Sequence, residues 1–290
     1  MKLSTIIRRR QVSPTLRRRR LGSELRRLRD ASGMNIDEVA EHLHCSSSTV
    51  SRIEKARVRV TLSVVRDMLQ LYGVTEQQRE ALLVLAREAR EKEGWWHAYG
   101  DVPDVRTYVG LESAAESILI YESLLIPGLF QNEDYARMVL SIIYQNLRTQ
   151  EIERHVEIRM ARQLILTGDD PLILRVVLDE AALRRLLGMG QLVSNQLRRL
   201  VEATGMSNVD LRILPFMGGA HGGMIGPFAI LSFSDSADPD VVHIEHPTGD
   251  LYLDQDSETR RYGLLFEHLE SVALTPDRST DFLVELMKEL

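Results

Sequence analysis

The spacing of apolar and polar residues predicts two kinds of structure in this chain. Up to about residue 93, apolar residues recur three and four positions apart, as on one face of a helix. Further on, helical patterns alternate with short runs rich in branched apolar residues, which are typical of strands. The pattern therefore predicts a mainly α N-terminal domain of five helices and a C-terminal α+β domain with a short-stranded sheet.

Start and stop signals divide the N-terminal pattern into helices. The first predicted helix covers residues 21–32 and ends at Gly33. Each later helix begins with a side chain that can cap it: Asn35, Ser46, Thr61 and Thr75. The predicted five-helix domain covers residues 21–93.

The third predicted helix follows a tight turn at His44-Cys45, and its outer face carries small hydroxyls and a cation. Such a helix suits the major groove of DNA, because small residues permit close approach and Arg52 can bind a guanine edge. The predicted base contacts are Ser47, Ser48, Ser51 and Arg52. The predicted phosphate contacts are Asn35, Ser46, Thr49, Lys55, Arg57, Arg59 and Thr61.

Residues 33–57 resemble the helix-turn-helix of the phage-repressor and xenobiotic-response-element type. The resemblance rests on Asn35, Glu38, Val39-Ala40, Leu43, Ser46, the run Ser48–Glu54, and Arg29 upstream. It implies that Ser47, Ser48 and Arg52 face base edges. It also implies that Arg29 and Glu54 form an ion pair that joins the first helix to the recognition helix. The alternative is a helical hairpin inside some larger bundle.

Three residues depart from the pattern of that family. Ile36 stands where a phosphate-binding glutamine is common, so one phosphate contact is weakened. His44 and Ala56 stand where glycines are common. Each must then hold a turn without glycine, at a cost of about 1 kcal/mol.

Charge is distributed unevenly along the chain. Residues up to Lys92 hold 20 Lys and Arg against 11 Asp and Glu, and the remainder holds 16 against 31. This asymmetry places double-stranded DNA at the N-terminal domain and not at the acidic C-terminal one. A single cysteine excludes an intramolecular disulfide, and the absence of a long apolar run predicts a cytoplasmic, nucleoid-associated protein without membrane contact.

Residues 1–20 are predicted to be a basic flexible arm. They contain Arg8–Arg10 and Arg17–Arg20, separated by Ser13-Pro14, and too few apolar residues to form a core. The arm either lies along DNA, on phosphates or in the minor groove, or is a solvated tail.

The remaining chain is predicted to contain an aromatic linker, residues 94–110, and a regulatory, partner-binding and dimerisation domain, residues 111–290. The linker includes Trp95-Trp96, expected to pack between the domains, with ligand stacking as the alternative. The predicted helices are residues 108–125, 132–143, 151–166, 180–187, 192–204, 259–273 and 279–290. The predicted strands are residues 172–178, 209–214, 228–233, 241–245 and 251–254.

This second half resembles the actinobacterial helix-turn-helix regulators that include WhiJ-like and antitoxin-like proteins. The matching motifs are Tyr121, Pro127–Gln131, Tyr135–Arg137, Arg162-Gln163, Asp179–Arg184, Gln196-Leu197, Leu214–Phe216 and Gly226–Phe228. The resemblance implies a transcription regulator with a sensing or partner-binding domain. It also implies a small companion protein encoded nearby.

Candidate sites for chemistry are weak in this domain. The glycines and histidine of one run, Gly218, Gly219, His221, Gly222 and Gly223, predict a flexible loop, with a ligand or partner lid as the alternative. His243 and Glu245 lack a third metal ligand with recognisable spacing, and Asp179-Glu180 is expected to cap a helix. We predict no metal, no cofactor and no enzymatic activity.

Two functions follow from these expectations. The first is a sequence-specific regulator that receives a ligand or protein signal through its C-terminal domain. The second is an antitoxin-like protein that mainly binds the companion and autoregulates its operon. In either case we expect a two-fold homodimer assembled through residues after Gly94, with residues 151–166 and 259–273 supplying the apolar contact.

Overall fold

The computed structural model describes residues 13–90, 95, 103–187, 191–246 and 249–289. They form two compact units, which lie within residues 11–97 and 98–290. The first is helical, and the second is an α+β domain built on a six-stranded mixed sheet. The predicted fold class is confirmed.

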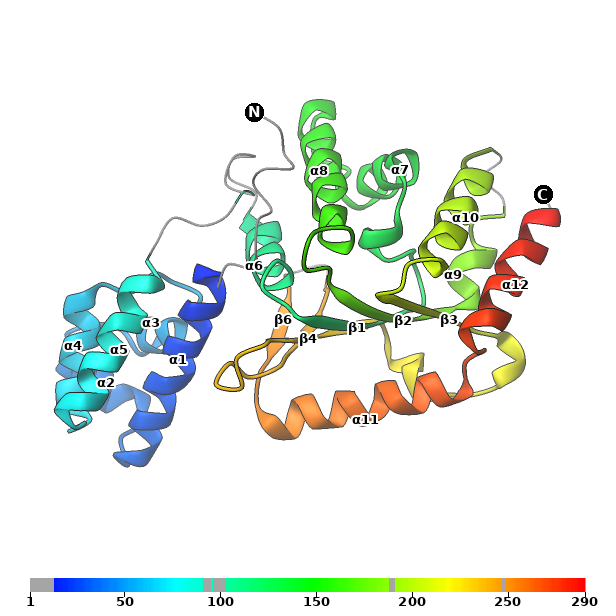
Figure 1. Ribbon diagram of the computed structural model, residues 1–290. Helices are drawn as coiled ribbons and strands as arrows, with labels where there is room; N and C mark the ends of the chain where they lie inside the picture. Colours follow the sequence, from blue (N-terminus) through cyan, green and yellow to red (C-terminus); the bar gives the residue numbers. More distant parts are fainter. Residues whose placement is uncertain (1–12, 91–94, 96–102, 188–190, 247–248, 290) are drawn as a thin grey trace. The chain divides into compact units, whose positions relative to one another are not determined.

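The N-terminal unit is a helical bundle around one apolar core (Figure 1). Each helix contributes buried residues to this core, among them Leu25, Val39, Val50, Val65 and Leu85. The helices are α1 (Pro14–Ala31), α2 (Ile36–His42), α3 (Ser47–Glu54), α4 (Leu62–Leu71) and α5 (Glu76–Glu88).

The predicted capping residues lie at the helix starts. At α2, Asn35 Oδ1 accepts from the Glu38 amide at 3.0 Å, and Glu38 Oε2 accepts from the Asn35 amide at 2.8 Å. Ser46, Thr61 and Thr75 accept in the same way from the amides three residues on. These bonds satisfy amide groups that have no partner within the helix.

The first helix begins earlier than the sequence pattern predicted. Ser13 caps α1 and Pro14 occupies its first turn, so Arg17–Arg20 are helical and not part of an arm. Ser13-Pro14 is a helix start signal, because proline needs no amide partner there and its φ suits the helix. Arg19 is buried and Arg17 pairs with Glu88 at 3.3 Å. The rest of the predicted arm, residues 1–12, lies outside the described residues.

The sheet of the C-terminal unit has the order β3-β2-β1-β4-β5-β6. Strands β1, β2 and β3 pair in parallel, whereas β4 to β6 form an antiparallel meander attached to β1. The strands are β1 (Ser117–Glu122), β2 (Ile173–Asp179), β3 (Val209–Leu214), β4 (Phe228–Ser232), β5 (Val241–Ile244) and β6 (Leu251–Leu253).

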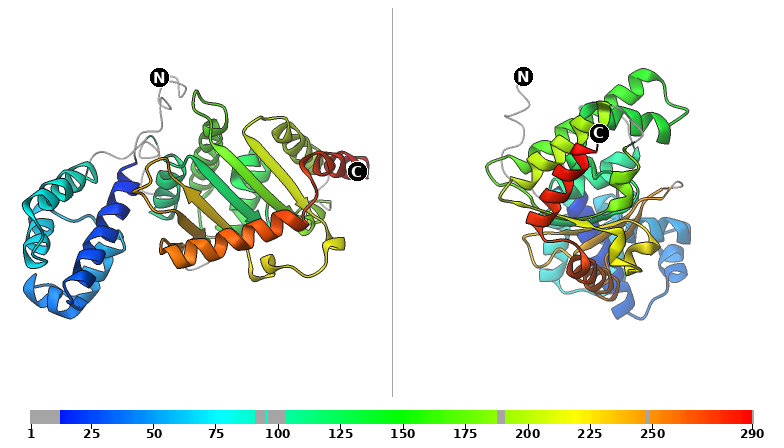
Figure 2. Two further views of the ribbon diagram at one scale, coloured as in Figure 1. Left: turned by 60° about the horizontal axis from the view of Figure 1, so that its bottom comes forward. Right: turned by 90° about the vertical axis from the view of Figure 1, so that its right-hand side faces the viewer.

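Helices cover both faces of this sheet. Helices α6 (Pro103–Glu112), α7 (Glu133–Ile143), α8 (Thr149–Arg162) and α10 (Gln191–Thr204) lie on one face (Figure 1). Helix α11 (Asp256–Val272) crosses the strands on the other face (Figure 2), where Tyr121, Phe228 and Phe266 share a core. Two more helices are α9 (Glu180–Arg184) after β2 and α12 (Pro276–Lys288), which packs on α10 and β3.

Two sequence predictions fail at the start of this unit. The predicted helix 108–125 ends at Glu112 as α6, and the central strand β1 follows it. The branched residues Ile118 and Ile120 favour a strand, and pairing with both β2 and β4 fixes it. Helix α6 also occupies part of the predicted linker 94–110, of which Gly94 and residues 96–102 lie outside the described residues.

Candidate functional site

The outer face of α3 carries the predicted base contacts. Ser48 and Arg52 are exposed, and Ser47 and Ser51 are half-buried. Arg52 lies along its own helix: its Nε donates to the Ser48 carbonyl and its Nη2 to Thr49 Oγ1, both at 3.3 Å. Ser47 donates to Asp37, which ties the start of α3 to α2. Arg52 makes only these weak local bonds in the described residues, so its guanidinium is available to a ligand.

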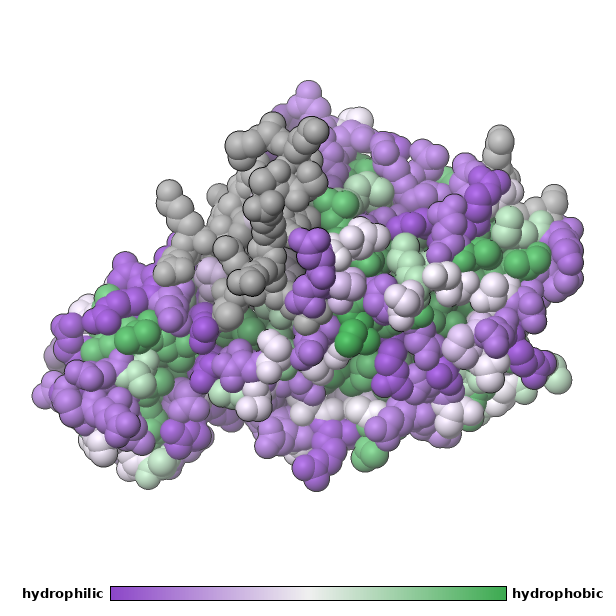
Figure 3. All heavy atoms as spheres, viewed as in Figure 1, coloured by the Kyte–Doolittle hydropathy of each residue, from purple (hydrophilic) through white to green (hydrophobic). Residues whose placement is uncertain are grey.

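The predicted phosphate contacts fall into two groups. Asn35, Ser46 and Thr61 are exposed caps at the starts of α2, α3 and α4, where the helix dipoles favour an anion. Thr49 is half-buried and bonds to Ser46 at 2.9 Å. Lys55, Arg57 and Arg59 are exposed directly after α3. The space-filling view shows hydrophilic residues over much of the visible surface of this unit (Figure 3).

Arg29 and Glu54 are brought together beneath this face. Arg29 Nε lies 2.7 Å from Glu54 Oε1, and Nη2 lies 3.1 Å from Oε2. Only 9% of the Arg29 side chain and 4% of the Glu54 side chain are exposed. The hydrogen bonds that Arg29 donates to the Glu54 carboxylate raise the pKa of Arg29 above its usual range. The pair therefore fixes the end of α3 to α1 with matched charges.

Both turns that flank α3 have left-handed backbone at a residue with a side chain. His44 has φ 51° and Ala56 has φ 53°. These are the residues that stand in place of common glycines, so the structure contains the strained turns that the sequence implied. A left-handed conformation costs such residues about 1 kcal/mol or more.

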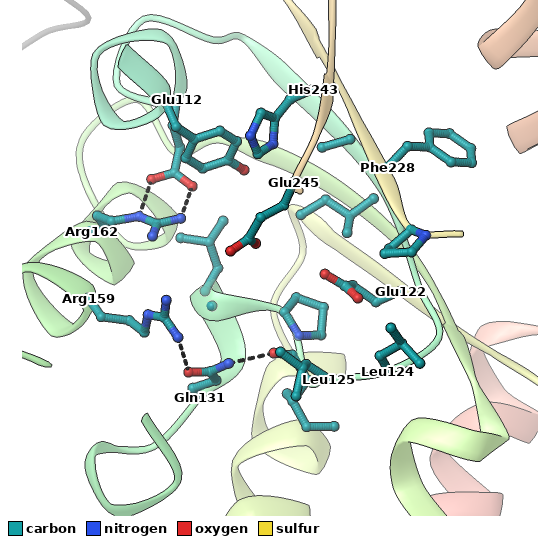
Figure 4. A pocket seen from close by; sticks show the side chains of 18 of the residues that line it. Glu112, Glu122, Leu124, Leu125, Gln131, Arg159, Arg162, Phe228, His243 and Glu245 are labelled. Carbon is teal, nitrogen blue, oxygen red and sulfur yellow. Dashed lines mark hydrogen bonds and ion pairs between the residues drawn. The ribbon is translucent and has the colours of Figure 1, made fainter. Parts of the chain in front are cut away.

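A second candidate site, not found from the sequence, is a cavity of about 290 Å³ in the C-terminal unit. Its apolar wall includes Ile120, Leu125, Pro127 and Ile143, and several charged side chains face it (Figure 4). The charged residues are Glu112, Glu122, Arg159, Arg162, Glu245 and Asp250. A small, mostly apolar cavity with a few convergent polar groups is typical of a ligand site.

The charges in this cavity differ in how well they are matched. Glu112 and Arg162 form two hydrogen bonds of 2.7 Å and neutralise each other. Arg159 instead donates to the neutral Gln131 Oε1 at 2.9 Å, and burial lowers its pKa to about 10. Burial, with the Glu245 charge, raises the pKa of Glu122 to about 8. Arg159 and Glu122 are thus two residues of the cavity whose charged forms are disfavoured by burial.

Polar side chains hold the turn that forms one wall of the cavity. Gln163 Nε2 donates to the carbonyls of Gly128 at 3.1 Å and Gln131 at 2.6 Å. The fully buried Gln196 donates to the Phe130 carbonyl at 2.9 Å and accepts from the Asn132 amide at 2.8 Å. These bonds connect three motifs of the sequence and give them a structural role that their spacing alone did not indicate: Pro127–Gln131, Arg162-Gln163 and Gln196-Leu197.

The glycine-rich run forms two short 3-10 turns, η5 (Phe216–Gly218) and η6 (Gly222–Ile225). A methyl group on Gly223 would lie 2.4 Å from the Tyr121 ring, and one on Gly222 would lie 2.4 Å from Leu265 Cδ1. His221 Nε2 lies 3.5 Å from Asp179 Oδ2. The turn at His221–Gly223 is therefore packed on the domain.

The other weak candidates have structural roles. Asp179 caps α9 by accepting from the Ala181 amide at 2.8 Å, and Glu180 accepts from the Phe216 amide at 2.9 Å. His243 Nε2 lies 3.3 Å from Asp250 Oδ1. Within the described parts of the chain, no group of three or more possible ligands is placed to hold a metal ion. No helix there has the length and apolar character needed to cross a membrane.

Two parts of the chain match known families. Residues 105–285 match a domain of unknown function (DUF5753), and residues 20–82 match a helix-turn-helix domain. No curated protein and no solved structure matches the chain. The second match confirms that the N-terminal unit is a helix-turn-helix domain of the kind found in DNA-binding regulators.

Proposed function

We propose that this chain, which belongs to the family defined by that domain of unknown function, is a sequence-specific transcriptional regulator of the xenobiotic-response-element and WhiJ-like type. The observation that carries the proposal is the exposed face of α3, where Ser48 and Arg52 are accessible and exposed cations follow. The regulator acts on chromosomal DNA in the cytoplasm. We propose no catalytic activity for it.

In this proposal α3 lies in the major groove. Ser47, Ser48, Ser51 and Arg52 contact base edges, while the caps and cations around α3 hold phosphates. The cations after α3 add a contact that does not depend on sequence and weakens with salt.

Replacing Arg52 by alanine should weaken operator binding by about 1–3 kcal/mol and relax preference at one base pair. The matched control is Arg57→Ala, since Arg57 is equally exposed but should contact phosphate. It should weaken binding to operator and random DNA alike. Binding selection on a randomised operator library measures both effects. A uniform loss for Arg52→Ala would exclude a base contact.

We also propose that the C-terminal unit forms the two-fold dimer. A single helix-turn-helix reads one short half-site, and symmetry doubles the contact. Four large apolar side chains, here called the loop patch, are exposed around the glycine-rich turns: Phe216, Met217, Met224 and Ile225. Turn η6 of the patch packs on α11, where Leu264 is 62% exposed. Exposed apolar patches of this kind mark protein interfaces.

The double substitution Met217→Ser and Ile225→Ser should convert the dimer to a monomer and weaken operator binding. Light scattering at micromolar concentration measures the mass of the full chain. Ile142→Ser is the control, since Ile142 is an exposed apolar residue on α7, outside the patch. It should leave the dimer intact. A wild-type monomer would refute the dimer.

The loop patch also supports the second candidate function. Two of its four residues are methionines, whose flexible side chains adapt to different protein partners. If the wild-type chain is monomeric, the patch is free for the small companion protein expected from the resemblance. Co-purification with the product of a small neighbouring reading frame, lost in the double variant, would establish the antitoxin-like function.

A further inference from the structure

The cavity between β1, α8 and the end of β5 has opposite charges on its walls. In the close-up, Arg159 points in from α8 on one side and Glu122 from β1 on the other, with Glu245 nearby (Figure 4). All of these residues belong to the C-terminal unit. The described residues that line the cavity therefore all come from one unit.

Among the described residues, Arg159 forms no hydrogen bond or ion pair with an anionic side chain. Its side-chain bond goes to the amide oxygen of Gln131, which is itself 2% exposed and donates to the Ile126 carbonyl at 2.7 Å. Gln131 thus fixes the direction of the guanidinium without neutralising it. An arginine held in this way is suited to bind a carboxylate.

The opposite wall carries the carboxyl groups of Glu122 and Glu245. Burial, together with the Glu245 charge, favours the neutral form of Glu122. The other acids of the cavity already have partners: Glu112 pairs with Arg162, and Asp250 Oδ1 lies 3.3 Å from His243 Nε2. An ammonium group placed between Glu122 and Glu245 would favour the ionised form of Glu122.

From this arrangement we infer that the cavity binds a small zwitterion, an amino acid or a close derivative with an apolar body. Its carboxylate pairs with Arg159, its ammonium pairs with Glu122 and Glu245, and its body lies against Ile120, Leu125 and Pro127. A cavity of about 290 Å³ has room for a ligand of this size. Only one part of the inference rests on the proposed regulator function, namely that this ligand is the signal the regulator receives.

Two sets of probes separate the contributions of the charges. Phenylalanine, phenethylamine and hydrocinnamate share one apolar group. Phenylalanine carries both charges, phenethylamine carries only the ammonium, and hydrocinnamate carries only the carboxylate. Leucine, isoamylamine and isocaproate form the second set. Calorimetry on the full chain should give the tightest binding for one of the two amino acids. Each single-charge analogue should bind roughly 10- to 100-fold more weakly.

Variants of the cavity charges have matched controls on the same elements. Arg159→Met and Glu122→Gln should each weaken amino-acid binding by roughly 10-fold or more. Arg154→Met on α8 and Glu116→Gln beside β1, both exposed, should not. Equal binding of a single-charge analogue and its amino acid, or no binding of any probe at millimolar concentration, would overturn the inference.

Proton release gives an independent readout. The groups facing Glu122 are Glu245 after β5, Arg159 on α8, Tyr108 on α6 and Tyr135 on α7. Since the raised pKa keeps Glu122 largely protonated at neutral pH, ammonium binding should release close to one proton from the wild type and none from Glu122→Gln. Equal release from both proteins would contradict the role of Glu122. No DNA is present, so failure here leaves the regulator proposal standing.

Discussion

Replacing Glu54 by alanine is expected to lower the free energy of unfolding of the N-terminal unit by about 3–5 kcal/mol. The substitution removes both hydrogen bonds to Arg29 Nε and Nη2 and leaves a buried guanidinium with the Met34 carbonyl, 3.0 Å away, and the exposed Asp30. A cation without its partner costs more than the pair contributes, because desolvation is no longer offset.

Urea unfolding followed by circular dichroism measures this loss, as a shift of the transition that belongs to the helical unit. Glu24→Ala is the control, since Glu24 pairs with Arg27 on an exposed surface and such pairs contribute about 0–1 kcal/mol. The double variant Arg29→Met with Glu54→Leu should recover most of the stability, because no charge is then stranded. An unchanged transition in Glu54→Ala would show that the pair does not stabilise the unit.

Gly22→Ala is expected to cost about 3 kcal/mol, near the upper end for overpacking, although alanine favours a helix more than glycine does. The added methyl group would lie 2.4 Å from the Glu54 carbonyl oxygen, which is backbone and cannot rotate away. Helices α1 and α3 would have to separate at the residue where the ion pair joins them. Operator affinity should fall as well, because α3 would tilt.

The matched control is Gly263→Ala, at a helical glycine of α11 with nothing near the added methyl group. It should stabilise the C-terminal unit by up to about 1 kcal/mol. Thermal unfolding by calorimetry separates the two units if they melt apart. Equal stabilisation by both substitutions would mean that α1 and α3 separate at little cost.

The N-terminal fold was predictable because its signals are local. A capping residue marks the start of each helix after the first, and the family pattern that pairs Arg29 with Glu54 is confined to helices in contact with each other. The sequence pattern does not predict the start of α1, because Ser13-Pro14 is equally typical of a break between two basic clusters. Ser13-Pro14 fits either a break in the chain or the start of a helix, and only the buried Leu16 that follows favours the helix.

The C-terminal fold was less accessible, and its cavity was not accessible at all. The sequence pattern predicts a helix where β1 lies, because Tyr108–Leu125 contains apolar residues at both spacings and the strand is fixed only by its pairing with β2 and β4. Glu122, Arg159 and Glu245 are far apart in sequence and no motif connects them. Their charges have meaning only once the sheet brings them to one cavity.

The order of the strands has a consequence for how the chain acquires its structure during synthesis. The helical unit uses contacts between neighbouring helices, which form quickly and need no later residue. Strand β1 instead pairs with β4, so the pairing of Tyr121 with Phe228 cannot form until Phe228 has left the ribosome. Until then β1 presents an unpaired apolar edge, open to association with other chains. We expect the helix-turn-helix to fold first, and chaperone demand to concentrate on the incomplete sheet.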